Sequence, residues 1–345
     1  MVGANHRPGA GWNVRKMEKR KEFSDLKRDV IDAGTCSGCG ACVAVCRLLD
    51  LDFLSIDPVS GLPVLGGHQQ STPAGEACAA TPLVRAAMGD ELQCPIDCGY
   101  CYYQCPRVEK PALREDLGEY YEVVTSDAEI KAAGVADDVL TSLLASALAD
   151  ALVEGVVAVA DTDGALPEVR IAMHKGALIE HAGGNYGAAA ALTGLADAIV
   201  NYGLWSVALV GTPCQMEAYE KLLSVGRETH NAHNFSSVVR LRIAVFCDGV
   251  LTSEGEKREG CKTCADLIGQ FADLSVGSIS ASAGASVVIV HTDVGKEVFE
   301  SAQQWSFIEA KPLDRSAITA LQQKQAEKRE AGLKEQARRA HSAEQ

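Results

Sequence analysis

Two closely spaced runs of cysteine constrain this chain more than any other feature of its sequence. The first run holds Cys36, Cys39, Cys42 and Cys46, and the second holds Cys94, Cys98, Cys101 and Cys105. A cubane of iron and sulfide needs a thiolate at each of its four iron atoms, and small residues such as Gly38 and Gly40 let the backbone wrap closely around it. We therefore predict one module that holds two iron-sulfur clusters.

The spacing of the runs is typical of bacterial ferredoxins, in which the fourth cysteine of each run crosses over to the other cluster. The second run has one extra residue between Cys94 and Cys98, and it keeps the proline that follows its last cysteine. The cross-over rule then gives two ligand sets: Cys36, Cys39, Cys42 and Cys105 hold one cluster, and Cys94, Cys98, Cys101 and Cys46 hold the other.

Structural zinc and disulfides are the alternatives for these cysteines. Zinc sites usually show two separated pairs of cysteine instead of a run of four. The chain has thirteen cysteines, and their clustering favours metal in a reducing compartment over a disulfide scaffold. Cys78 lies apart from both runs, and we interpret it as a free thiol, with replacement of Cys94 as a ligand as the alternative.

Length, charge and hydropathy limit the classes of function. At 345 residues the chain can build two or three domains. A formal net charge of −14 argues against nucleic acid as a partner. No signal peptide and no apolar run of membrane-spanning length is visible, so we expect a cytoplasmic protein that meets a membrane only through partners. Residues 1–28 are locally basic, which favours a solvated arm over a docking segment.

From about residue 115 the composition changes to Ala, Val and Leu, and helical and strand patterns alternate. This alternation predicts an α/β domain with a central sheet, within a chain that is α+β overall. We expect helices over 138–152, 188–202 and 294–304, strands over 156–160, 205–210, 241–246 and 286–291, and a loop over 58–80. The predicted organisation is a basic arm (1–28), a two-cluster ferredoxin-like domain (29–112), the α/β domain (115–312) and a charged helical tail with a solvated face (313–345).

A third set of four thiols lies in the α/β domain. Cys214 follows the strand predicted over 205–210, Cys247 ends the strand predicted over 241–246, and Cys261 and Cys264 form a CxxC pair. Spacing alone leaves zinc and a cubane equally open for this set. The two clusters predicted upstream favour a cubane, because a neighbouring redox centre gives their electrons a destination.

The same residues carry a resemblance to a known family. Gly211-Thr212-Pro213-Cys214-Gln215, Phe246-Cys247, the segment 260–266 and the segment 271–278 resemble the beta-subunit family of coenzyme F420-reducing hydrogenase and F420H2 dehydrogenase. The two-cluster module ahead of this domain is similar to the electron-input subunit of membrane F420H2 dehydrogenases and to F420-dependent sulfite reductases. The resemblance implies FAD, a third 4Fe-4S cluster on Cys214, Cys247, Cys261 and Cys264, and hydride exchange with coenzyme F420.

The resemblance also implies where the flavin lies, near the turns at 134–141 and 182–186. The cofactor-binding residues would be Thr141, Gly183, Gly184, Asn185 and Tyr186, and no catalytic residue is assigned. The chain departs from the family by Asp137-Asp138 in the first turn, by Gly184-Asn185-Tyr186 in the second, and by a short interval between Cys247 and Cys261. The glycines at 183–187 lack the spacing of a dinucleotide fingerprint, which argues against NAD.

Three functions follow from these observations. The first is an oxidoreductase subunit in which F420 reduces FAD, and electrons pass through three 4Fe-4S clusters to a redox partner such as a hydrogenase, an F420H2 dehydrogenase or a heterodisulfide reductase, as in methanogenesis. The second is an electron-transfer adaptor that has lost the F420 site and with it FAD. The third is a reductase of the same family that acts on another substrate, such as the chlorophyll-related reductases of phototrophs.

Overall fold

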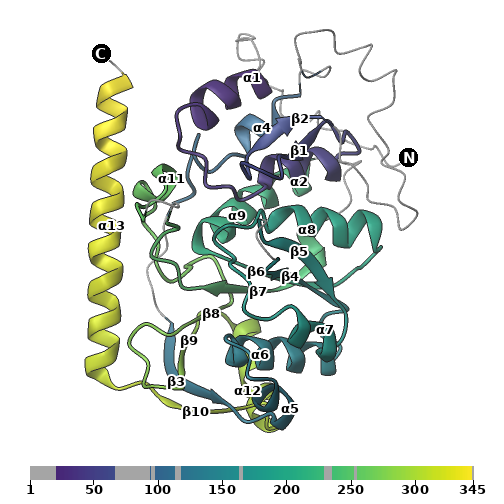
Figure 1. The fold of residues 1–345 in the computed structure, drawn as a ribbon, viewed down its shortest axis with the longest axis vertical. Coiled ribbons are helices and arrows are strands. Elements are labelled where there is room, and N and C mark those ends of the chain that lie inside the picture. Colours follow the sequence, from purple (N-terminus) through teal and green to yellow (C-terminus); the bar gives the residue numbers. More distant parts are fainter. Residues whose placement is uncertain are drawn as a thin grey trace, which may run out of the picture.

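The computed structural model describes residues 21–66, 94, 98–112, 118–162, 166–228, 235–251 and 255–343. A small N-terminal module, comprising the described part of residues 21–112, packs on a larger α/β domain, and a long C-terminal helix runs along one side of both (Figure 1). Residues 1–20 of the predicted basic arm (1–28) and Cys78 lie outside the described residues. Residues 23–28 of the arm are helical, and Phe23 and Leu26 are buried, which corrects the solvated arm expected over that stretch.

The N-terminal module is built from short elements around its cysteines. Its strands β1 and β2 pair antiparallel, with Leu54 opposite Leu65. The strand over 63–65 corrects the loop predicted from residue 58 onward, because its apolar residues pair with β1 and cover a core that contains Val43. The elements are α1 (Phe23–Leu26), the π-helix η1 (Lys27–Ile31), α2 (Ala41–Leu48), β1 (Leu54–Ile56), β2 (Pro63–Leu65) and α4 (Tyr100–Tyr103).

The α/β domain is organised around an eight-stranded mixed sheet of order β10-β3-β9-β8-β7-β6-β4-β5. Its centre, from β4 through β6 and β7 to β8, is parallel, and the outer strands pair antiparallel. The predicted central sheet is therefore confirmed. The strands are β3 (Glu119–Thr125), β4 (Gly155–Ala160), β5 (Glu168–Ala172), β6 (Val207–Gly211), β7 (Val239–Val245), β8 (Leu274–Gly277), β9 (Ser286–Val290) and β10 (Ile308–Pro312).

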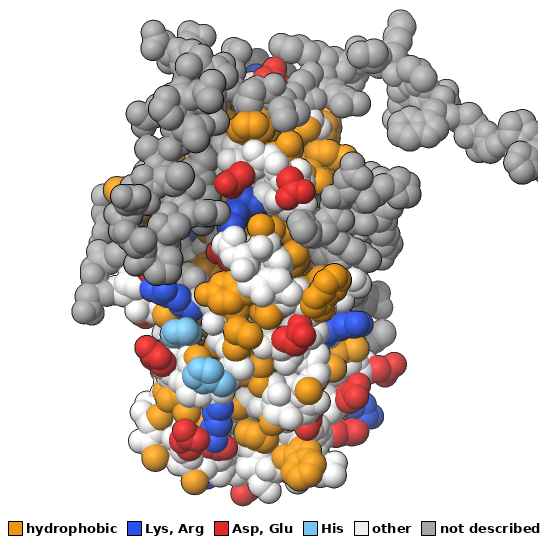
Figure 2. Space-filling view, turned by 90° about the vertical axis from the view of Figure 1, so that its right-hand side faces the viewer, with side chains coloured by type: hydrophobic (Ala, Val, Ile, Leu, Met, Phe, Trp, Pro, Cys, Tyr) orange, Lys and Arg blue, Asp and Glu red, His pale blue; other side chains and the backbone are white. Residues whose placement is uncertain are grey.

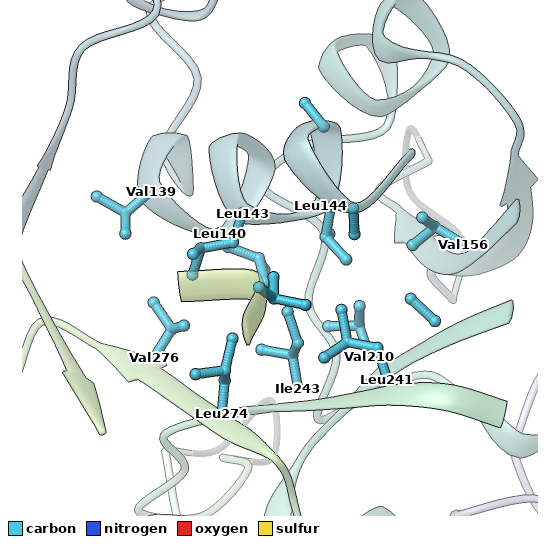
Figure 3. Close-up of a cluster of buried hydrophobic side chains, with 14 of the residues drawn as sticks. Val139, Leu140, Leu143, Leu144, Val156, Val210, Leu241, Ile243, Leu274 and Val276 are labelled. Atoms are coloured by element: carbon cyan, nitrogen blue, oxygen red, sulfur yellow. The ribbon is translucent and has the colours of Figure 1, made fainter. Parts of the chain in front are cut away.

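Helices cover both faces of this sheet, as the nearly continuous apolar strands require. Alternate residues of β6 serve opposite faces: Val210 joins the core under one group of helices, and Leu209 joins the core under the other. Figure 3 shows the first core, where Leu143 and Leu144 lie over Ile243 and Leu274. On that side lie α5 (Ala128–Ala133), α6 (Asp138–Ala149), α7 (Lys175–Glu180) and α12 (Asp293–Gln304).

The second core joins the two modules. It contains residues of α8 (Leu192–Ala196), of the π-helix η2 (Asp197–Asn201) and of α9 (Pro213–Glu228), together with α2 of the N-terminal module. The Leu192 amide donates to the Cys39 carbonyl at 3.2 Å. Gly40 adopts a φ of 82°, and a Cβ there would lie 2.9 Å from the Ala190 carbonyl oxygen. The modules that the sequence separates near residue 115 therefore share one packed interior.

The remaining helices are α10 (Phe235–Val238), α11 (Glu259–Lys262) and α13 (Arg315–Ala343). The helices predicted over 138–152 and 294–304 are confirmed, and the one predicted over 188–202 is divided between α8 and η2. No helix in the described ranges is both long enough and apolar enough to cross a membrane. On the face drawn in Figure 2, acidic and basic side chains are interspersed among hydrophobic ones.

Candidate functional site

The structure brings together the first predicted ligand set, Cys36, Cys39, Cys42 and Cys105, which we call the Cys36 set. All four cysteines line one small space beside Leu26 and Val30, at the N-terminal end of α2. The thiols of Cys36, Cys39 and Cys105 each act electrostatically on that of Cys42, whose pKa burial raises well above its ordinary value. Four thiols from two distant runs thus face one another, as the cross-over rule requires.

The second predicted set, called the Cys46 set, contains Cys46, Cys94, Cys98 and Cys101. Burial, together with the charges of Cys94 and Cys98, raises the pKa of the Cys46 thiol to about 11. Burial also raises the pKa of Cys101 to about 12, with Cys98, Cys94 and Cys46 acting in the same direction. The amide of Phe53 donates to the Cys46 sulfur at 3.3 Å. The two sets are neighbours, because Cys101 also acts on Cys42.

The third thiol set, Cys214, Cys247, Cys261 and Cys264, is assembled by the sheet. Cys214 lies in the first turn of α9, directly after β6, and Cys247 follows β7. Because neighbouring parallel strands end at the same edge, these two cysteines meet there. The CxxC pair comes from α11 and the residues after it. All four cysteines line one space, together with Thr212, Gly187 and Arg258.

The donors around these thiols fit an iron-sulfur cluster. The Val250 amide donates to the Cys261 sulfur at 3.4 Å, and the Gly38 amide donates to the Cys36 sulfur at 3.4 Å. Such amides are what tune a bound cluster. Among the described residues, no three Cys, His, Asp or Glu side chains lie close enough to share one metal ion. A single tetrahedral zinc holds its sulfurs about 3.8 Å apart, whereas a cubane spreads its thiolates over four iron atoms.

Gly260 and Arg258 connect the third thiol set with the Cys36 set. A Cβ on Gly260 would lie 2.4 Å from the Cys36 carbonyl oxygen, so α11 packs directly against the first cysteine run. Arg258 donates from Nη2 to the Ser37 carbonyl at 2.7 Å and to the Gly187 carbonyl at 3.3 Å. These contacts place the third set beside the N-terminal module.

Arg107 is the residue of this junction that the sequence analysis missed. It lines the space of the third set, and its Nε and Nη1 are buried with no hydrogen-bond partner among the residues that the structure describes. Cys214 and Cys264 of the third set and Cys39 of the Cys36 set all act on its charge. The only signal in the sequence is its position two residues after Cys105. A buried cation between eight thiols is placed to compensate the negative charge of thiolate-bound clusters.

The predicted flavin residues also come together, at the carboxyl end of β4, but most of them serve the fold. The Thr141 hydroxyl donates to the Asp137 carbonyl at 2.9 Å, and Tyr186 is buried. A Cβ on Gly184 would lie 2.0 Å from the Val159 carbonyl oxygen. The Gly183 backbone has a φ of 87°, a conformation that favours glycine.

Carboxylates surround this turn. The Asn185 amide donates to Asp161 Oδ1 at 2.9 Å. Burial raises the pKa of Asp137, and the neighbouring charges of Asp138 and Asp161 raise it further. We call residues 182–187 with these three aspartates the acidic turn. A concentration of negative charge does not fit the pyrophosphate of FAD.

The charged tail forms the helix α13. One of its faces packs on the residues around the third set, which corrects the expectation that its charges mark only a solvated face. Gln325 accepts from the Leu267 amide at 2.7 Å, and Gln336 donates to the Thr263 carbonyl at 2.8 Å. Lys328 donates to the Cys247 carbonyl. A Cβ on Gly332 would lie 2.4 Å from the Cys264 carbonyl oxygen. These positions recur every three or four residues, which puts them on one side of the helix.

Comparisons with known proteins match the α/β domain. The family described as "Coenzyme F420 hydrogenase/dehydrogenase, beta subunit N-term" matches residues 120–196, and its companion for the C terminus of the same beta subunit matches residues 204–257 and 252–316. A solved chain of the F420-reducing NiFe hydrogenase complex from Methanosarcina barkeri has the same fold, with a TM-score of 0.57 at 22% identity, and the match covers 64% of this chain and 94% of that one.

Two curated proteins extend the comparison. An uncharacterized protein of Methanocaldococcus jannaschii is 28% identical in an alignment 335 positions long, and the match covers 83% of this chain and 91% of that protein. The coenzyme F420 hydrogenase subunit beta of Methanothermobacter thermautotrophicus is 26% identical over a match that covers 62% of this chain and 93% of that protein. The family matches include more than half of the residues and all four cysteines of the third set. The chain therefore belongs to the coenzyme F420 hydrogenase/dehydrogenase beta-subunit family.

Proposed function

We propose that this protein is the iron-sulfur flavoprotein subunit of an oxidoreductase, which takes electrons from reduced coenzyme F420 and passes them singly to a partner complex. The observation that carries the proposal is the succession of three four-cysteine sets in contact with one another. Family membership supports the choice of F420, since relatives are named as F420 hydrogenase subunits.

The contacts give the electron path an order. The third set lies beside the Cys36 set, because Gly260 packs against Cys36. The Cys36 set lies beside the Cys46 set, because Cys101 acts on Cys42. In this proposal each set holds one 4Fe-4S cluster, so electrons enter at the third set and leave for the partner from the Cys46 set. The N-terminal module is then the output end of the chain.

The chain's own residues bind and insulate this path. Because burial raises the pKa of the Cys105 thiol to about 12, cluster assembly must displace its proton with iron. Arg107 supplies a buried positive charge between two clusters, and Arg258 fixes the Ser37 and Gly187 carbonyls on either side. A flavin, when bound, accepts a hydride from the two-electron donor and releases the two electrons one at a time.

A second candidate function is an electron-transfer adaptor without FAD and F420. The acidic turn favours it, because three carboxylates stand where the resemblance places the flavin. The adaptor keeps all three thiol sets and differs from the first proposal only at the electron entry.

Dye reduction distinguishes the two. Full-length protein is reconstituted anaerobically with iron and sulfide, mixed with reduced F420 and a viologen dye, and assayed for released flavin. The oxidoreductase subunit reduces the dye and releases stoichiometric FAD, and Cys214→Ser serves as the control that interrupts the path. Flavin without turnover indicates another two-electron donor. Neither flavin nor turnover, with iron still bound, establishes the adaptor and overturns the first proposal.

A further inference from the structure

A cavity of about 510 Å³ lies between α13 and the residues around the third thiol set. That volume falls within the range of sites that bind cofactor-sized ligands. One wall comes from α13, through Lys324, Lys328 and Ala331, and the opposite wall includes Leu267 and Ile279. In Figure 1 this helix runs beside α11, which carries Cys261. Neither the family resemblance nor the glycine turns pointed to this place.

The cavity has an excess of positive charge. Its lining holds four lysines, Lys257, Lys262, Lys324 and Lys328, against the two acids Asp248 and Glu327. Lys257 pairs with Asp248 at 3.0 Å, and Lys262 pairs with Glu259. Lys324 and Lys328 project from adjacent turns of the same helix, so their charges reach one region of the wall. Such a concentration of ammonium groups attracts a phosphate or carboxylate group.

The cavity also touches the third thiol set. Cys261, Cys264 and Lys328 line both this cavity and the space that the four cysteines enclose. A ligand in the cavity would therefore lie against the cluster that the third set holds. Lys328 stands between the two, because its ammonium donates to the Cys247 carbonyl.

We propose that this lysine cavity binds a phosphate-bearing, redox-active ligand, with its ring against Leu267 and the CxxC pair and its phosphate at Lys324 and Lys328. The inference rests on the proposed function and deepens it by placing the electron entry at α13 instead of at the acidic turn. If the ligand is a flavin, its two-electron-reduced form would give its electrons one at a time to a cluster held by the third set and release two protons to solvent. If it is F420, it would give up a hydride to a flavin bound beside it, and that flavin would pass the electrons on singly. Two successive single-electron transfers to the partner restore the clusters.

A binding titration tests the location. Reconstituted full-length protein is titrated anaerobically with FAD and, separately, with coenzyme F420, and binding is followed by ligand fluorescence. FAD bound in purified protein identifies a resident cofactor, and reversible binding of F420 alone identifies a substrate. We expect the double variant Lys324→Gln/Lys328→Gln to bind its ligand at least about tenfold more weakly, the value of one lost charge-assisted hydrogen bond. Lys334→Gln, on α13 but outside the cavity lining, should bind within about twofold of wild type.

Replacing Lys328 also removes its hydrogen bond to the Cys247 carbonyl. A second variant therefore tests the cavity without changing that contact. Ala331→Trp fills the cavity from an exposed helix position. We expect it to abolish ligand binding while iron content and far-ultraviolet circular dichroism stay at the wild-type level. Unchanged affinity in both variants, with dye reduction intact, overturns the location and leaves the proposed function standing. A wild-type protein with full clusters that binds neither FAD nor F420 overturns both.

Discussion

The two regions that border the third thiol set carry opposite charge. The acidic turn reaches the set through Gly187 and holds Asp137, Asp138 and Asp161. The lysine cavity reaches the same set through Cys261, Cys264 and Lys328 and holds four lysines. Glycine-rich turns suit a cofactor phosphate only where the local charge permits it. The comparison therefore shows that charge, more than backbone shape, decides where an anionic ligand meets this cluster.

The largest effect is expected when a cysteine of the third set, which both regions adjoin, is replaced. Cys264→Ser should lower bound iron by about four atoms per chain, the content of one cubane. Iron analysis after anaerobic reconstitution measures this loss. Cys78→Ser is the matched control and should keep all of the iron. Loss of iron from the Cys78 variant, with Cys94→Ser unaffected, would instead make Cys78 a ligand in place of Cys94.

The next test separates α13 from the cysteines beneath it. Replacing glycine by alanine in a helix normally stabilises by about 1 kcal/mol. At Gly332 the new Cβ would meet the Cys264 carbonyl oxygen at 2.4 Å, so we expect Gly332→Ala to destabilise the protein by about 1–3 kcal/mol. Urea unfolding of the reconstituted protein measures the change. A gain in stability would show that α13 does not pack on the third set.

A smaller effect, on the reduction potential of the third cluster, is expected from Arg107, which lies between that set and the N-terminal module. A reduced cluster carries one more negative charge, so losing the buried guanidinium should lower the reduction potential of the third cluster. We expect Arg107→Gln to lower it on the order of 60 mV, a tenfold change in a one-electron equilibrium. Arg107→Lys should retain most of the wild-type potential, and the exposed Arg338→Gln should change nothing. A redox titration followed by electron paramagnetic resonance measures these potentials. Equal potentials in all variants would show that the Arg107 charge does not influence the third cluster.

The smallest expected effect comes from the acidic turn. If the anionic ligand lies in the lysine cavity, the double variant Asp137→Asn/Asp138→Asn should bind FAD or F420 within about twofold of wild type, since these carboxylates do not face it. A ligand phosphate at the turn predicts the reverse, a tightening of about tenfold as repulsion is removed. Fluorescence titration beside the Lys324→Gln/Lys328→Gln variant compares the two borders directly.

Local patterns in the sequence predicted the grouping of the thiols and the central sheet. The spacing of Cys36 to Cys46 fixes which thiols can share a cluster, and the position of Cys214 after a buried strand fixes the edge where it emerges. Both depend on a few neighbouring residues. The strand over 63–65 was missed, because its pairing with β1 overrides the local turn-forming composition.

Contacts between distant segments could not be predicted in the same way. Gly332 in a charged helix gives no sign that it packs on Cys264, and Arg107 gives no sign that it is buried between two thiol sets. The regular charges of α13 predicted a solvated face. They gave no sign that Gln325 and Gln336, on the other face, form hydrogen bonds with the backbone beside Cys264. These environments arise from the packing of distant segments, which helical or strand periodicity in the sequence does not predict.

The most direct test of the account is whether reduced F420 places electrons on the clusters of this chain. Reconstituted protein with its flavin is mixed with reduced F420 under anaerobic conditions, frozen, and examined by electron paramagnetic resonance, with dithionite reduction as the reference. The account predicts signals of reduced 4Fe-4S clusters with F420, and their loss in the Ala331→Trp variant while dithionite still reduces it. Clusters that dithionite reduces but F420 leaves oxidised in the wild-type protein would contradict it.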